Sequence, residues 1–125
     1  MTFGAIPDGL PFAPLVIIRL VERVPVRGAP GLNTIPSWVH TMYSLTHSLI
    51  IAGVIVSILF YINTRVGIAA GAWILHIIMD IPVHTQGYFR TPFLYPLSDF
   101  AINGVNSLKL WAVNWMILIL VYTFI

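Results

Sequence analysis

The chain has 125 residues, of which 58% are hydrophobic and only 8% are charged. Because a soluble domain carries roughly 25% charged residues, this composition cannot cover a water-facing surface, and it predicts an all-α integral membrane protein of one domain, residues 1–125. The net charge of +2 rests on too few charges to bear on nucleic acid, but there is no basic cluster with interleaved aromatics, so no nucleic-acid partner is expected. The absence of cysteine excludes disulfides, thiolate sites and iron–sulfur clusters.

The N-terminal part of the chain contains a short apolar segment, residues 12–24, that carries charges. Arg19, Glu22 and Arg23 share one face of it, and Pro25 would end a helix there. The segment is too short and too charged to span a membrane, so it predicts an amphipathic helix lying in the interface. The residues before it lack a basic region followed by an apolar core, so no cleaved signal peptide is expected.

Three later segments predict membrane-spanning helices. They cover residues 37–63, 67–84 and 108–125, and Pro82 should kink or end the second one. An aromatic loop, residues 85–107, connects the second and third spans. Its aromatic side chains and prolines predict a loop that is ordered against the membrane surface.

The positive charges are unevenly distributed over this predicted topology. Arg65 lies in the short connection between the first two spans, whereas the other arginines and the single lysine lie on the opposite side. Because positively charged loops stay in the cytoplasm, the aromatic loop is expected at the cytoplasmic face.

The second predicted span contains a row of ionisable residues. His76, Asp80 and His84 follow one another at intervals of four residues and so lie near one face of a helix. An ionisable residue at membrane depth costs about 2.5–3.5 kcal/mol on insertion scales and usually has a function. Folding the first two spans as a hairpin brings His47 to the level of His84. Imidazoles and a carboxylate together predict a divalent metal site, with zinc as the first choice.

These residues also have structural interpretations, and two loop residues extend the candidate site. A histidine within the membrane can simply bond a neighbouring helix, and Asp80 can form an ion pair with Arg90. In the catalytic interpretation, whichever of Asp80 and Asp99 is not a ligand acts as general base or orients a ligand imidazole. Arg90 would then hold an anionic group such as a lipid phosphate.

Three segments, YSLTHSLIIAG, WILHIIMDIPVHT and RTPFLYPLSDF, resemble the YdjM-like family of small bacterial inner-membrane proteins classed as metal-dependent hydrolases. The resemblance covers about residues 40–104. It implies a location in the bacterial inner membrane and a metal site. The residues implied at or near that site are His47, His76, Asp80, His84 and Asp99.

The sequence leaves three functions open. The first is a membrane-embedded hydrolase that cleaves an ester or phosphoester of a lipid-like substrate at the cytoplasmic interface, where a metal would lower the pKa of bound water to about 7. The second is a haem b-binding electron-transfer subunit with His47 and either His76 or His84 as axial ligands, although the nearby Asp80 argues against it. The third is a non-enzymatic accessory subunit of a homo-oligomer or larger membrane complex.

Overall fold

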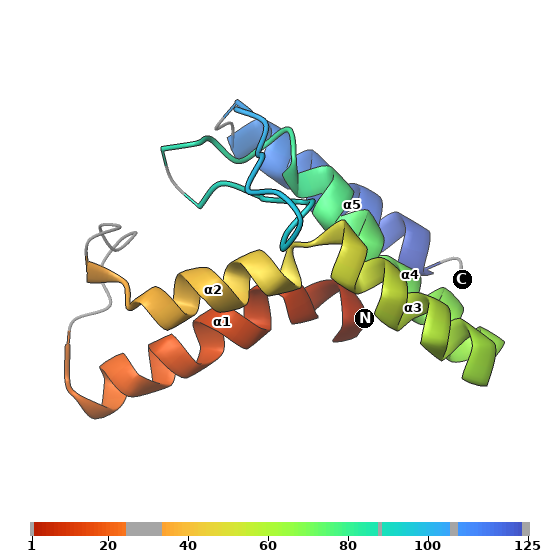
Figure 1. Cartoon of the computed structure of the whole chain (residues 1–125), viewed down its shortest axis with the longest axis horizontal. Helices are drawn as coiled ribbons and strands as arrows, with labels where there is room; N and C mark the ends of the chain where they lie inside the picture. The colour runs from red at the N-terminus through yellow and green to blue at the C-terminus, as the bar shows by residue number, and fades with distance from the viewer. Residues whose placement is uncertain (1, 25–33, 88, 106–107, 124–125) are drawn as a thin grey trace.

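The computed structural model describes residues 2–24, 34–87, 89–105 and 108–123, and its regular elements are five α-helices. The all-helical prediction is therefore confirmed for this part of the chain. Figure 1 shows α1 running beside α2, and α3 and α4 forming an antiparallel hairpin with α5 packed against α4. In chain order the helices are α1 (Thr2–Val21), α2 (Ser37–Thr46), α3 (Leu49–Ile62), α4 (Thr64–Asp80) and α5 (Leu108–Thr123).

The N-terminal helix differs from the predicted interfacial helix at residues 12–24. It begins at Thr2 and includes Pro7, Pro11 and Pro14. A proline inside a helix removes its own N–H donor and crowds the carbonyl four residues earlier, and here contacts of α1 with α2 and α4 hold the helix together. The helix was predicted to be too short to span a membrane, but its earlier start changes that: Phe3–Val21 has the length and composition of a membrane span or of a signal sequence.

The predicted first span, residues 37–63, is two helices that meet at His47 and Ser48 with a bend of 54°. The break exposes backbone groups that side chains and the aromatic loop satisfy. Ser48 caps α3 by accepting a hydrogen bond from the Ile51 amide at 3.2 Å, and the Leu49 amide donates to the Phe93 carbonyl at 2.9 Å. The bend thus places His47 at a helix junction in the interior, where it is fully buried.

The α3–α4 hairpin is closed by a cap and by a close approach of its two helices. The Asn63 side chain accepts hydrogen bonds from the Arg65 and Val66 amides and so begins α4. Gly67 allows the helices to meet, since a Cβ at that position would lie 2.3 Å from the Cα of Phe60.

The fourth helix ends at Asp80, earlier than the predicted end at residue 84. Pro82 has no N–H to continue the helical bonding, and the chain turns so that the amides of Val83 and His84 both donate to the Asp80 carbonyl. His84 therefore leaves the helical row that its spacing predicted.

The membrane topology is supported only in part. Among the described residues, Phe3–Val21 is the one helix that is long and apolar enough to cross a membrane, and α2 with α3 would be a second if the bent pair forms one span. The helices α4 and α5 have 17 and 16 residues, below the usual length of a span. Three spans therefore remain a prediction.

Candidate metal centre

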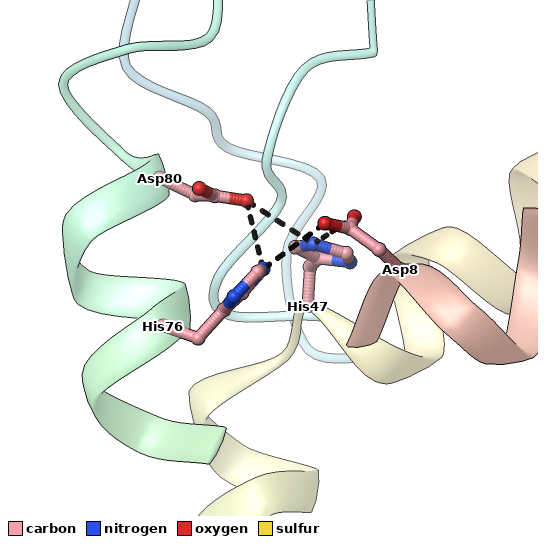
Figure 2. A group of neighbouring side chains, drawn as sticks. All are labelled: Asp8, His47, His76 and Asp80. Carbon is pink, nitrogen blue, oxygen red and sulfur yellow. Dashed lines mark ion pairs between the residues drawn. The ribbon is translucent and has the colours of Figure 1, made fainter. Parts of the chain in front are cut away.

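Four side chains from three separate parts of the chain converge where α1, the α2–α3 junction and α4 meet (Figure 2). His47 comes from the junction, His76 and Asp80 come from the last turns of α4, and Asp8 comes from α1. One ligand atom of each lies within 4.8 Å of all the others. His47, His76 and Asp80 are buried, whereas the Asp8 side chain is 45% exposed. The group is thus enclosed on three sides and open at Asp8.

The separations between these atoms fit a single ion. The Asp80 Oδ2 atom lies 3.3 Å from both the His47 Nε2 and the His76 Nε2 atoms. The Asp8 Oδ1 atom lies 3.5 Å from His47 Nε2, and its Oδ2 atom lies 3.6 Å from His76 Nε2. Tetrahedral ligands at about 2.0–2.2 Å from a zinc ion are about 3.3–3.6 Å from one another. Both separations from Asp80 Oδ2 lie in this range, whereas Asp8 reaches it through a different oxygen for each histidine, so Asp8 would turn slightly to offer one oxygen to the ion.

The directions of the polar atoms distinguish this group from a simple ion pair. His47 Nε2, His76 Nε2 and Asp80 Oδ2 are buried and make no hydrogen bond, although each imidazole nitrogen lies 3.3 Å from the carboxylate oxygen. Buried polar atoms are nearly always satisfied, so an unsatisfied set that faces a common point calls for a ligand. A cation among the four atoms would satisfy all of them at once.

Tyr43 sets the tautomer of His47. The His47 Nδ1 atom lies 3.1 Å from the Tyr43 carbonyl, and because a carbonyl can only accept, Nδ1 carries a proton and donates it. In the neutral imidazole this leaves the Nε2 lone pair free, which is the arrangement found in metal-binding histidines. The Tyr43 ring also stacks on the His47 ring, with centroids 3.8 Å apart. Tyr43 therefore holds the orientation of this imidazole, together with the Thr46 hydroxyl, which lies 3.2 Å from the same Nδ1 atom.

Asp8 is brought to the group by a proline pair and a threonine. A proline at position 11 has no N–H to donate to the Pro7 carbonyl one turn earlier. The Thr46 hydroxyl at the end of α2 donates to that carbonyl at 2.8 Å instead. The Trp73 indole on α4 donates to the Thr46 carbonyl at 2.7 Å. Thr46 thus ties α1, α2 and α4 together beside Asp8.

His84, a predicted ligand, lies outside the four-residue group. Its Nδ1 atom is 2.6 Å from the Tyr43 hydroxyl and 3.2 Å from Thr91 Oγ1. Burial lowers the pKa of this imidazole, which lies beyond the last residue of α4, and the nearby Asp80 carboxylate opposes that change. His84 nevertheless lines the same cavity as Asp8 and Asp80.

The predicted catalytic residues of the loop do not join the group. Asp99 and Arg90 are both exposed, and the carboxylate of Asp80 faces His47 and His76 rather than Arg90. Arg90 lines a separate hollow of about 250 Å³. The residues that line this hollow are His40, Tyr43, Ser44, Gln86, Phe89 and Arg90.

Sequence reasoning missed Asp8. The available signal was an acid within an otherwise apolar stretch, and it is the one acidic residue before Glu22. The predicted helix began at residue 12, so Asp8 lay outside every predicted helix and no partner was sought for its carboxylate.

Comparisons with protein-family models, curated proteins and solved structures gave no match to this chain. The resemblance to the YdjM-like family therefore stays a prediction, and the argument for function rests on the geometry of the site.

Proposed function

We propose that the protein is a membrane-embedded metal-binding protein that hydrolyses an ester or phosphoester at the cytoplasmic interface. Asp8, His47, His76 and Asp80 would hold one divalent ion. The observation that carries the proposal is the convergence of four ligand atoms, three of them buried and without a hydrogen bond.

The chemistry of the four ligands favours a divalent transition-metal ion, with zinc first. Two neutral imidazoles and two carboxylates contribute a charge of −2, which one divalent ion neutralises. Nitrogen and carboxylate ligands in a roughly tetrahedral arrangement suit zinc, whereas calcium and magnesium prefer oxygen ligands alone. Zinc is therefore the preferred ion, and the same donors can also bind manganese or iron.

The haem alternative is disfavoured by the position of the carboxylates. Axial histidines approach a haem from opposite faces, so the macrocycle must pass between their nitrogens. Here Asp80 Oδ2 lies 3.3 Å from both His47 Nε2 and His76 Nε2 and fills that space. A small ion fits among these atoms without displacing the carboxylates.

A membrane location is supported by the distribution of apolar side chains. Large apolar residues are exposed on α1, at the end of α3 and in the aromatic loop, including Val21 at 78%, Ile62 at 73% and Leu97 at 81%. Exposed apolar surface on this scale is unfavourable in water and is expected where lipid or a partner covers it. We place the chain in the bacterial inner membrane as a multi-pass protein, with membrane lipid as its principal contact.

Two hollows beside the metal centre support a hydrolytic role. A cavity of about 30 Å³ borders Asp8, His76 and Asp80, and an open hollow of about 300 Å³ borders Asp8. The walls of the larger hollow are mostly aromatic, formed by Phe12, Tyr43, His84 and Phe89. An amphiphilic substrate would place its apolar part against these rings and its ester at the exposed side of Asp8. With the exposed Asp8 exchanging with solvent, a divalent ion held by His47, His76 and Asp80 would keep an open position, where it would lower the pKa of a bound water molecule and polarise the ester.

The first experiment is metal analysis of protein purified in mild detergent. We expect about one zinc, manganese or iron ion per chain in the wild type. Asp8→Asn, His47→Ala, His76→Ala and Asp80→Asn should each lower that stoichiometry, whereas the control His40→Ala should not, because His40 stacks on Phe89 away from the group. A wild-type protein without stoichiometric metal, or an Asp8→Asn variant with unchanged affinity, would contradict the proposed site.

The second experiment tests hydrolysis with the metal-loaded protein. Candidate substrates are an aryl phosphate, an aryl ester and lipids that carry a phosphomonoester, presented in mixed micelles. Turnover should disappear in His76→Ala and persist in His40→Ala. Metal binding without turnover of any of these substrates would support a structural metal and refute the hydrolase part of the proposal.

A further inference from the structure

A second polar cluster adjoins the metal centre and shares its cavity. His84, which is outside the first group of ligands, lines the cavity of about 30 Å³ together with Asp8, His76 and Asp80. We propose that His84, Asp8 and Asp80 form a second divalent-cation site, so that the centre is binuclear and takes a phosphoester. This inference rests on the proposed function, because it needs the first ion to be bound.

The ring of His84 is held in an orientation suited to a ligand. Its described side-chain hydrogen bonds all involve Nδ1, which lies 2.6 Å from the Tyr43 hydroxyl and 3.2 Å from Thr91 Oγ1. When the Nδ1–H donates to the tyrosine hydroxyl, the Tyr43 hydroxyl can donate in turn to Thr91 Oγ1, 3.4 Å away. In this one of the two tautomers that the contact allows, the Nε2 lone pair of a neutral imidazole is available to a metal. A metal-binding histidine is typically oriented by a hydrogen bond at its other ring nitrogen.

Tyr43 thereby orients two histidines with two different groups. Its carbonyl accepts from His47, a ligand of the first ion, and its hydroxyl bonds His84. A single buried residue thus fixes both imidazoles relative to each other.

The two carboxylates have oxygen atoms to share between two ions. Asp80 faces both His47 and His76 through the same atom, Oδ2, so its Oδ1 atom is outside those two contacts. Asp8 presents Oδ1 to His47 and Oδ2 to His76. Carboxylates that bridge are a regular feature of two-metal sites, in which the ions lie about 3.5–4 Å apart. Asp8 and Asp80 line the cavity with His84 and are placed to bridge.

The cavity is large enough for an ion. One water-sized probe needs about 10–15 Å³ measured in the same way, and the cavity measures about 30 Å³. Asn114 of α5 also lines the cavity, and its side chain donates to the Met79 carbonyl at 2.7 Å, which holds α5 against the end of α4. A second ion would therefore bind in a walled space and not on an open surface.

Charge balance then specifies the substrate class. Two divalent ions bring +4 against the −2 of Asp8 and Asp80, so the loaded centre needs an additional anion. A phosphoester supplies charge and oxygen atoms to both ions, whereas a neutral carboxylic ester supplies no charge. The second ion should accordingly bind more weakly than the first and more tightly when inorganic phosphate is present.

The test is a titration of metal-free wild-type protein with Mn²⁺, with and without inorganic phosphate, followed by electron paramagnetic resonance. We expect two ions per chain with phosphate and a spin-coupled signal from the pair. His84→Ala should abolish the second ion and the coupling while keeping the first ion. Tyr43→Phe keeps the ring and the carbonyl, so it should weaken only the second ion, by about 10–100-fold. The control His40→Ala should behave as wild type.

The outcomes separate this inference from the proposed function. One ion per chain at saturating Mn²⁺ and phosphate would refute the second site and leave the first intact. Two ions without spin coupling, or a coupled pair that survives both His84→Ala and Tyr43→Phe, would also refute it. Absence of any bound ion would instead refute the proposed function itself.

Discussion

The hydrogen bond from Thr46 to the Pro7 carbonyl provides a sharp test of how the site is assembled. Pro11 cannot donate to that carbonyl, so the 2.8 Å bond from the Thr46 hydroxyl replaces the missing helical bond. Thr46→Val keeps the shape of the side chain and removes the donor. The buried carbonyl then stays unsatisfied next to Asp8, which belongs to the metal group.

The expected loss follows from the burial of both groups, since Pro7 and Thr46 are each buried. Leaving a buried carbonyl unsatisfied costs about 1–3 kcal/mol, so the free energy of unfolding should fall by about that amount. Thr46→Ser keeps the hydroxyl and should lose distinctly less. If part of this free energy holds Asp8 in place, its loss should also weaken metal binding. The affinity should then fall about tenfold for each 1.4 kcal/mol.

The assay is a double-mutant cycle measured by denaturant unfolding in mild detergent, together with metal affinity. Pro11→Ala restores an N–H that can donate to the Pro7 carbonyl, so Thr46→Val should cost little in that background. We expect a coupling energy of about 1–2 kcal/mol between positions 11 and 46. Because each comparison is made within one background, the packing change caused by Pro11→Ala cancels.

Two results would refute this reasoning. The first is an equal loss from Thr46→Val with Pro11 and with alanine at that position, which would show that the bond does not replace the missing helical donor. The second is a Thr46→Ser variant as unstable as Thr46→Val, which would assign the effect to the lost methyl group.

Two further substitutions test the packing that supports the site. Gly67→Ala should destabilise the protein by about 1–3 kcal/mol, because the new Cβ would lie 2.3 Å from the Phe60 Cα, whereas Gly71→Ala meets nothing within 4 Å and should be neutral or slightly stabilising in the same unfolding assay. Trp73→Phe removes the indole donor to the Thr46 carbonyl and should cost about 1–3 kcal/mol; an unchanged unfolding midpoint would show that water or another donor satisfies that carbonyl.

The part of the site that lies on one helix could be predicted from the sequence. His76 and Asp80 are separated by one helical turn within a continuous helix, so periodicity alone places them on one face. His47 followed from folding the two helices as a hairpin, and the structure brings it within 3.3 Å of Asp80. Composition and apolar runs likewise predicted an all-helical chain, which is confirmed for the described residues.

The position of His84 depended on where α4 ends. His84 was assigned to the row on the assumption that the helix continued past Asp80, but Pro82 removes a donor and the chain turns. Its imidazole is therefore held by the Tyr43 hydroxyl, a contact between residues 41 positions apart. No local pattern contains that contact.

The sequence by itself determined the helical class, the apolar character and the pair of candidate ligands on α4, because these depend on composition and on the period of a single helix. Only the tertiary structure decided that Asp8 completes the group, because its place depends on a proline-containing helix whose Pro7 carbonyl is bonded by Thr46, 39 positions after Pro7. Periodicity describes which side chains share a face. It cannot report which donor, from another helix, satisfies a carbonyl that a proline leaves free.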